Sequence, residues 1–247
     1  MDGMTSVEKA VDVLFHLHAE PSPVGVTELG RALGLPKSSA HRLLASLARR
    51  GLVERDERGR YAPGFGLVAL GLGAVDRDPL VTAARDVLPR EAATLGETVF
   101  LVASRAGKLV VLDKAEGGGF LRASPHVGSE VPLHATAVGK LFLAYGDASA
   151  APGRLERFTE NTPTRRAELD AAVSEARRAG YAHSREEWIA GLSVIAAPVL
   201  VRHRMLGALA VGASTPRLEA GDLDAITESV REAADRIAAK LEGTSHE

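Results

Sequence analysis

The sequence predicts an α+β fold in two parts: a winged helix-turn-helix, followed by a domain in which helices flank an antiparallel or mixed sheet. Three observations indicate this fold. Apolar residues recur at helical spacing through about the first 50 positions. Two short strand-like runs then enclose a polar turn at residues 56–59. Beyond about residue 75, short apolar runs alternate with helical patterns, without a fixed repeat.

The composition is that of an ordinary folded chain. It has 247 residues, 45% hydrophobic and 25% charged, with a net charge of −2, which suits one or two domains. The absence of cysteine excludes disulfides, thiolate metal sites and a cysteine nucleophile. There is no signal-peptide pattern, and the longest apolar run, Val194–Val201, is far shorter than the roughly 18 residues of a spanning helix. We therefore expect a soluble cytoplasmic protein that makes no membrane contact.

Two helices open the predicted winged helix-turn-helix. The first, at about residues 5–19, is indicated by one apolar face and ends before Pro21. That face consists of Val7, Ala10, Val11, Leu14 and Leu17. The second helix, Glu28–Leu33, follows Thr27, whose side chain can cap it, and closes at Gly34.

The third helix starts near Pro36, which suits a first helical turn, and ends at Gly51. Its buried stripe follows the spacing i, i+3, i+4, i+7. The stripe consists of Ala40, Leu43, Leu44 and Leu47. Strand-like runs at Leu52–Arg55 and Arg60–Ala62 form the wing. A linker helix at Phe65–Ala74 leads onward, and its glycines lower its stability, which suits a hinge.

Charge is unevenly distributed along this unit. Residues 31–60 hold eight Lys or Arg residues against three Asp or Glu residues, whereas residues 1–30 hold one against five. A basic block within this motif indicates a double-stranded DNA operator as partner. The residues expected to contact DNA are Thr27, Lys37, Ser38, Ser39, His41, Arg42, Arg55, Arg58 and Arg60. The helix would read the major groove, and the ribbon would reach flanking phosphates or a minor groove.

Each of these assignments has an alternative. A basic helix face can be a solvated surface without any partner. Ser38 and Ser39 can equally cap the third helix instead of contacting bases. The order of helices, glycine turn and basic ribbon favours DNA binding over both alternatives.

The remaining chain predicts the second unit. We expect domains at 1–75 and 76–247, with the linker helix at about 65–75. The predicted strands are Thr98–Ala103, Leu109–Ala115, Phe120–Ala123, Tyr181–Ser184, Val194–Val201 and Leu206–Ala213. The predicted helices are Asp78–Leu95, Thr136–Tyr145, Thr164–Ala179 and Asp222–Leu241.

Three segments of the second unit form an ordered set of motifs. They are VPLHATAVGKLFLA (Val131–Ala144), GYAHSREEWIAGLSVIAAPV (Gly180–Val199) and LGALAVGASTPRL (Leu206–Leu218). In order and spacing they resemble the signatures of the IclR family of bacterial transcriptional regulators, and the resemblance covers nearly the whole chain. It implies a GAF-like effector domain that binds a small molecule, often an organic acid or aromatic metabolite. It also implies homodimers, commonly paired into homotetramers, that repress or activate nearby metabolic genes through a roughly palindromic operator.

The same resemblance implies which residues surround the effector. By motif these positions are Ala137, Val138, Ser184, Val194, Ala210 and Gly212. Only Ser184 keeps a side-chain hydroxyl, and a carboxylate buried without donors is unfavourable. We therefore expect a larger or less polar effector, although backbone N–H groups near Thr136–Gly139 can hold an acid. His134 is a further candidate donor, with a structurally hydrogen-bonded histidine as the alternative.

Enzyme motifs fail in this sequence. Gly139-Lys140 is followed by Leu141 rather than Ser or Thr, so a phosphate loop is excluded. Gly191–Ile195 lacks the closing glycine of a nucleophile elbow. The eight histidines show no zinc-site spacing. We expect no enzyme activity, no cofactor and no metal; the alternative function is a small-molecule-binding module or metabolic enzyme without a DNA role.

Three further side chains have open roles. Glu186 and Glu187 are interpreted as a pair of surface acids, because exposed charges are readily tolerated. Trp188, the only tryptophan, is expected to fill a core rather than to form a pocket wall.

Overall fold

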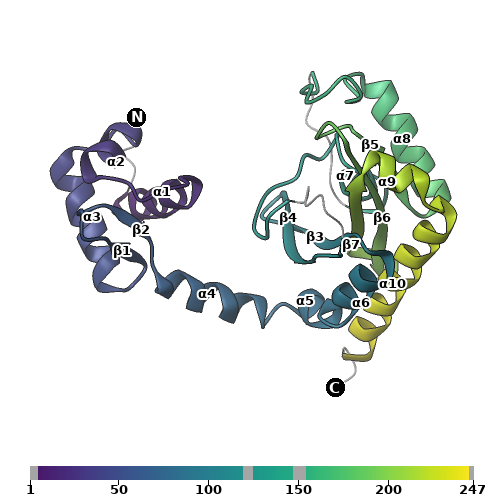
Figure 1. The fold of residues 1–247 in the computed structure, drawn as a ribbon, viewed down its shortest axis with the longest axis horizontal. Helices are drawn as coiled ribbons and strands as arrows, with labels where there is room; N and C mark the ends of the chain where they lie inside the picture. Colours follow the sequence, from purple (N-terminus) through teal and green to yellow (C-terminus); the bar gives the residue numbers. More distant parts are fainter. Residues whose placement is uncertain (1–4, 119–124, 147–153, 245–247) are drawn as a thin grey trace. The chain divides into compact units, whose positions relative to one another are not determined.

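The structure, a computed structural model, describes residues 5–118, 125–146 and 154–244. The chain forms two compact units that meet in the sequence between Arg77 and Asp78 (Figure 1). Each unit has a hydrophobic core of its own. Among the described residues, no helix is both long enough and apolar enough to cross a membrane.

The N-terminal unit is a winged helix-turn-helix, which confirms the predicted fold. Its elements are α1 (Ser6–Ala19), α2 (Val26–Ala32), α3 (Lys37–Arg49), β1 (Val53–Arg55), β2 (Tyr61–Pro63) and α4 (Phe65–Val75). β1 and β2 pair in antiparallel fashion, and Val24 adds a further bridge to Tyr61. The core under α3 contains Ala40, Leu44 and Leu47, all members of the predicted stripe. α3 therefore has its basic face free to point away from the core.

Several apolar side chains of α1 are not covered by the core of the N-terminal unit. Val13 and Leu17 are buried, whereas Val7 is 73% exposed, Val11 42% and Phe15 69%. The predicted buried face is therefore wrong for Val7 and Val11. The three exposed residues are spaced four apart, so they form a stripe along one side of the helix.

α2 begins earlier than the sequence predicted. Its N-cap is Gly25, and the carboxylate of Glu28 accepts a hydrogen bond from the Gly25 backbone N–H at 3.3 Å. The capping role expected for Thr27 is wrong, since Thr27 lies inside the first turn with its side chain exposed. Gly34, with φ of 63°, ends the helix as predicted.

The start of α4 is fixed to the C-terminal end of α3. The backbone N–H of Gly66 donates to the carbonyl of Gly51 at 2.8 Å, and that of Phe65 donates to the Glu54 carboxylate at 3.1 Å. A Cβ at Gly64 would lie 2.5 Å from the Gly51 carbonyl oxygen, so this approach requires glycine. The first turn of α4 therefore belongs to the same body as α3.

The C-terminal unit is built on one five-stranded sheet in the order β4-β3-β7-β6-β5. Its strands are β3 (Thr98–Arg105), β4 (Lys108–Ala115), β5 (Ala182–Arg185), β6 (Leu192–Val201) and β7 (Arg204–Ser214). Its helices are α5 (Pro79–Ala84), α6 (Val87–Leu95), α7 (Ala137–Tyr145), α8 (Arg166–Ala179), α9 (Thr215–Ala220) and α10 (Leu223–Thr244). Every neighbouring pair of strands is antiparallel, which decides between the two predicted kinds of sheet.

The structure differs from the predicted elements in a few places. The helix predicted from Asp78 to Leu95 is two helices, separated by a turn at Arg85 and Asp86. α9 was not predicted, because six residues are too few to show a helical period. The strand predicted at Phe120–Ala123 lies outside the described residues.

Helices cover both faces of the sheet (Figure 1). α10 packs on β6 and β7, with α6 beside it, whereas α7 packs on β6 and β7 from the other face, with α8 behind α7. An apolar cluster lies between α7 and the sheet and contains residues of both. It is this face of the sheet that carries the predicted effector positions.

The N-terminus of α7 lies tightly against the segment before it. The hydroxyl of Thr136 accepts from the Gly139 N–H at 3.0 Å and donates to the Pro132 carbonyl at 2.7 Å. A Cβ at Gly139 would lie 1.9 Å from the Leu133 carbonyl oxygen. The position of the first turn of α7 is therefore fixed by packing that only glycine permits.

Candidate nucleic-acid interface and ligand cavity

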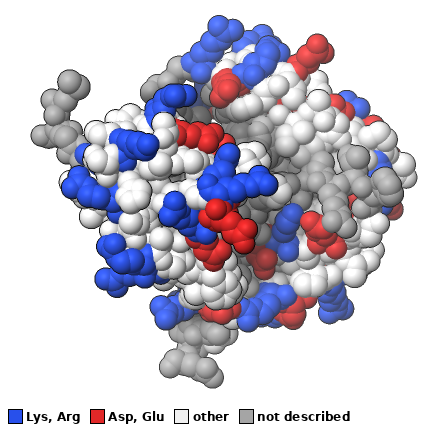
Figure 2. All heavy atoms as spheres, turned by 60° about the vertical axis from the view of Figure 1, so that its left-hand side comes forward, with Lys and Arg blue, Asp and Glu red and all other residues white. Residues whose placement is uncertain are grey.

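The outward face of α3 presents most of the predicted DNA-contacting residues together. Lys37, Ser38, His41 and Arg42 are exposed and line one shallow hollow, and Ser39 is half-buried beside it. The face shown in Figure 2 carries Lys and Arg side chains in several groups, with Asp and Glu side chains between them. Since α3 begins at these residues, its positive N-terminal dipole adds to their charge.

The wing residues differ in how free they are. Arg58 is exposed at the turn between β1 and β2. Arg55 lies over the ring of Tyr61, with its guanidinium carbon 5.6 Å from the ring centre. Arg60 instead faces the body of the unit, where its Nε donates to the Pro23 carbonyl at 2.5 Å. The structure therefore brings Arg55 and Arg58 to the wing surface and holds Arg60 back from it.

Four of the predicted effector positions are brought together on the face of the sheet under α7. Ser184, Val194 and Gly212 are directly paired across β5, β6 and β7. Ala210 is paired with Phe100 and lies two residues before Gly212, so it faces the same side. Ser184, at 5% exposed, is the one residue of the four with a side-chain hydroxyl. The surface offered to a ligand is otherwise apolar.

α7 adds two more of the predicted positions, but His134 lies apart. Ala137 and Val138 form the first turn of α7 and belong to the same apolar cluster. The Nε2 of His134 is 2.8 Å from the carbonyl oxygen of Glu156, and its ring lies 5.6 Å from that of Phe158. His134 thus has a structural partner, and its side chain is not among the described residues that line the cavity below α7.

A small cavity lies between α7 and the sheet. Its lining residues are Phe100, Pro125, Val131, Thr136, Val138, Trp188, Leu192 and Val194. Its volume is about 20 Å³, which is room for roughly one water molecule. Among the described residues that line it, Thr136 alone supplies a side-chain hydroxyl, and that hydroxyl is already used in capping α7. A metabolite can enter only if one wall moves.

Sequence reasoning missed most of this lining. Trp188 is half-buried; it packs against the core and also forms a cavity wall, so the expectation of a purely core residue is wrong. Phe100 and Leu192 are ordinary apolar strand residues, and only the pairing of strands reveals that they face α7. The motifs did place Val138 and Val194 at this site, and the helix start expected at Thr136 also lines the cavity.

A buried ion pair lies next to this cavity. The Nζ of Lys140 is 2.5 Å from the Glu187 carboxylate and donates to the His183 carbonyl at 3.1 Å. The two side chains are 6% and 13% exposed, so the interpretation of Glu186 and Glu187 as a pair of surface acids is wrong for Glu187. Its partner lies 47 residues earlier in the chain.

His183 lies partly buried beside that pair. Burial lowers the pKa of His183 below its usual value, and the charges of Lys140 and Arg185 lower it further. The ring is therefore neutral near pH 7. Within the described ranges, no group of three or more His, Asp or Glu side chains is placed to hold a metal ion.

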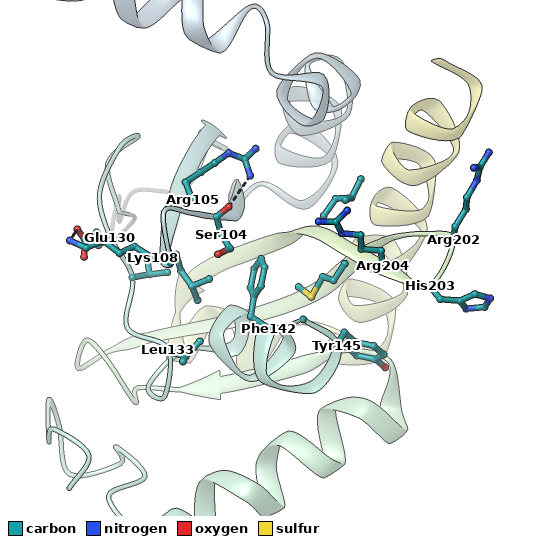
Figure 3. Close-up of a pocket in the computed structure, with 16 residues that line it drawn as sticks. Ser104, Arg105, Lys108, Glu130, Leu133, Phe142, Tyr145, Arg202, His203 and Arg204 are labelled. Atoms are coloured by element: carbon teal, nitrogen blue, oxygen red, sulfur yellow. Dashed lines mark hydrogen bonds and ion pairs between the residues drawn. The ribbon is translucent and has the colours of Figure 1, made fainter. Parts of the chain in front are cut away.

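A larger hollow, of about 920 Å³, lies at the opposite end of the sheet, by the β3–β4 and β6–β7 turns (Figure 3). Phe142 and Tyr145 of α7 contribute to its wall, and Arg204 is one of several charged residues around it. Lys108 there is paired with Glu130 at 2.5 Å. Among the described residues that line this hollow, none is a predicted effector contact, so we do not assign the effector to it.

Two family profiles together span most of the chain. "IclR helix-turn-helix domain" matches residues 6–57, and "Bacterial transcriptional regulator IclR C-terminal" matches residues 72–239. The HTH-type transcriptional regulator BhcR of Paracoccus denitrificans is 32% identical, over 94% of this chain and 85% of its own.

Solved structures show the same fold. An IclR transcriptional regulator from Alicyclobacillus acidocaldarius has a TM-score of 0.83 and 27% identity, covering 97% of this chain and 99% of its own. An IclR homologue from Microbacterium hydrocarbonoxydans, in complex with 4-hydroxybenzoate, has a TM-score of 0.85 and 23% identity, covering 97% and 100%.

Proposed function

Because the chain belongs to the IclR family of bacterial transcriptional regulators, we propose that it controls nearby metabolic genes by binding a roughly palindromic operator under the direction of a small effector. The family consists of DNA-binding regulators rather than enzymes. The observation that carries the proposal is the exposed face of α3. No ion pair within the described part of the chain engages Lys37 or Arg42, so their charges are available to a nucleic acid.

The proposed DNA interface has two parts. Lys37, Ser38, His41 and Arg42 enter the major groove, where Arg42 reaches a guanine edge or a phosphate. Arg58 and Arg55 on the wing contact the flanking backbone. Ser39 is near enough to the first group to join it, whereas Thr27 serves as a phosphate contact from α2. We leave Arg60 out of the interface, because its guanidinium is engaged by Pro23 and Glu28.

A second copy of this chain is the proposed partner of the N-terminal unit. Val7, Val11 and Phe15 form an exposed apolar stripe on α1, and Phe65 and Leu72 of α4 are 71% and 59% exposed. Apolar surface of this kind favours association. The same unit carries the recognition helix, so joining two copies here would place two heads on one duplex, which a palindromic operator requires. Pairing of such dimers into tetramers is the further expectation.

The proposed effector is a small, largely apolar molecule that opens the cavity under α7. Trp188, Phe100 and Val194 would cover its apolar part. The backbone N–H groups of Ala137 and Val138, in the first turn of α7, have no acceptor within the helix and can hold a carboxylate. This combination fits an aromatic or acyl acid better than a small dicarboxylate.

The DNA-binding proposal is tested by fluorescence anisotropy on the DNA upstream of the protein's own gene. Arg42→Ala should weaken binding by about 1–3 kcal/mol, the range for a lost base or phosphate contact. Affinity should also fall with added salt, because phosphate contacts release counterions. Arg178→Ala on α8, in the other unit, is the matched control. The wild type could instead bind the upstream DNA no more tightly than random DNA, with an affinity that does not change with salt. That result would favour a ligand-binding module without a DNA role.

The effector proposal is tested by thermal shift with a small panel of acids. A ligand that binds only the folded state raises the melting temperature. We expect 4-hydroxybenzoate, or an acyl acid of similar size, to raise it more than succinate or glyoxylate does. A larger shift with the small polar acids would refute the assignment of an apolar effector.

A further inference from the structure

The loop between β5 and β6, residues 186–191, is held from two sides. On one side, the hydroxyl of Thr162, a buried residue, donates to the Glu187 carbonyl at 2.6 Å. On the other side, the Glu187 carboxylate accepts from Lys140 of α7. Trp188 follows directly and forms a wall of the apolar cavity. One short loop thus carries both an anchor and a cavity wall.

α7 has the same double role. Thr136 and Val138, in and before its first turn, line the cavity with Trp188, and Lys140 lies two residues beyond Val138. The first turn of α7 cannot shift readily, because Gly139 is in close contact with the preceding backbone. The Lys140–Glu187 ion pair therefore links the cavity wall on α7 to the wall formed by Trp188.

Stability alone does not explain this ion pair. Oε2 of Glu187 and Nε2 of His183 are the two buried side-chain polar atoms without a hydrogen-bond partner among the described residues. Glu187 is the one of these two residues whose side chain is bonded to Lys140, whereas His183 accepts from Lys140 through its backbone carbonyl. Taking two charges out of water is unfavourable, and an ion pair with an unsatisfied oxygen recovers less of that free energy than a fully hydrogen-bonded one. What the pair supplies is a defined distance between α7 and the loop.

We infer that the buried Lys140–Glu187 ion pair positions Trp188 against Val138 and so determines the size of effector that the cavity admits. Lys140 and Glu187 are positioning residues, because neither is among the residues that line the cavity. This inference rests on the proposed effector-binding function. It predicts that the pair controls the loop even in the protein without ligand.

The sole tryptophan makes that prediction measurable in the full-length protein without ligand. We compare the wild type with Lys140→Met/Glu187→Leu, which removes both charges and keeps similar bulk. Acrylamide quenching and the emission maximum of Trp188 report its exposure, and thermal unfolding reports the fold. In the double variant, quenching should rise about twofold or more, as for a loop that opens locally. Emission should shift to longer wavelength, with a melting temperature at or above that of the wild type.

A conservative variant gives the opposite pattern. Glu187→Gln keeps an oxygen acceptor for Lys140 but leaves the buried ammonium without a counter-charge. We expect its melting temperature to fall while Trp188 quenching stays near the wild-type value. Glu175→Gln, which breaks the exposed pair with Arg178 on α8, is the control and should change neither measurement.

Two results would overturn the inference. Unchanged quenching in the double variant would show that the pair does not position Trp188. Loss of folding in the double variant would show that the pair supports the fold rather than the loop.

A ligand measurement separates this inference from the proposed function. Thermal shifts are measured with 4-hydroxybenzoate and with the larger 2-naphthoate. If the pair limits cavity size, the double variant should gain response to 2-naphthoate relative to 4-hydroxybenzoate. An unchanged ratio would count against the size limit. If neither acid shifts either protein, the effector assignment fails, while the quenching comparison still decides whether the pair positions the loop.

Discussion

Replacing Gly139 with alanine is the sharpest test of how α7 is seated. An alanine Cβ would lie 1.9 Å from the carbonyl oxygen of Leu133 and 2.5 Å from its carbonyl carbon, against ordinary contacts of about 3.5–4.0 Å. Both obstacles are backbone atoms, so no side-chain rotation relieves the contact. α7 or the preceding segment must move by more than about 1 Å.

Whether Gly139→Ala raises or lowers stability depends on two opposing free energies, the helix preference of alanine and the cost of overpacking. Alanine favours a helix over glycine by about 1 kcal/mol, whereas overpacking a core costs about 1–3 kcal/mol and more where backbone must shift. We expect Gly139→Ala to lower the free energy of unfolding by about 2 kcal/mol. For a unit of this size, that corresponds to a melting temperature lower by about 4–8 °C.

A second glycine in a helix provides the matched control. No atom lies within 4 Å of the Cβ position at Gly71 in α4, so Gly71→Ala should gain the helical preference of about 1 kcal/mol without a clash. Differential scanning calorimetry measures both variants against the wild type. A melting temperature for Gly139→Ala equal to or above that of the wild type would show that α7 is not packed this closely against Leu133.

Three other predictions concern the C-terminal unit: one the turn between β6 and β7, and two its buried ionisable side chains. Arg202 and His203, with φ of 48° and 66°, are both left-handed, so Arg202→Asn/His203→Gly should raise stability by about 1–2 kcal/mol in urea denaturation; an unmoved midpoint would contradict this. Burial lowers the pKa of His183 below its usual value of 6.5, so the unfolded chain binds the proton first and stability should fall as pH drops below 6.5. His183→Gln should flatten that slope, and an unchanged slope would contradict this. Arg236→Ala would leave the 5%-exposed carboxylate of Glu91 without its cation and should lower stability by about 3 kcal/mol; a loss under about 1 kcal/mol would mean that water replaces the arginine.

Local signals in the sequence were sufficient for much of the fold. The stripe of α3 was predicted because spacing alone decides which face of a helix is buried. The end of α2 was predicted because Gly34 takes the left-handed conformation that closes helices. The start of α2 was misplaced, since a glycine N-cap carries no side-chain signal and the cap is supplied by Glu28.

The candidate sites also differ in whether they depend on local signals or on contacts between distant residues. The exposed face of α3 was predictable, because both its periodicity and its charge are local. The surroundings of Glu187 were not, because the Lys140 that buries it is distant in sequence and a carboxylate is usually exposed. The size of the cavity was equally hidden, since it depends on how Trp188, Phe100 and Val138 meet across three separate elements.

The junction of α4 with the C-terminal end of α3 makes the linker a lever. The backbone N–H of Gly66 in α4 donates to the carbonyl of Gly51, two residues after the end of α3. A backbone rotation at residues 76–78 would therefore move α3 and α4 as one arm. An arm of 11 residues is about 16 Å long. A rotation of about 15° at its base would carry the tip about 4 Å, close to one base-pair step of about 3.4 Å. If two copies bind one operator as proposed, a rotation of this size would be enough to put their recognition helices out of phase with the duplex.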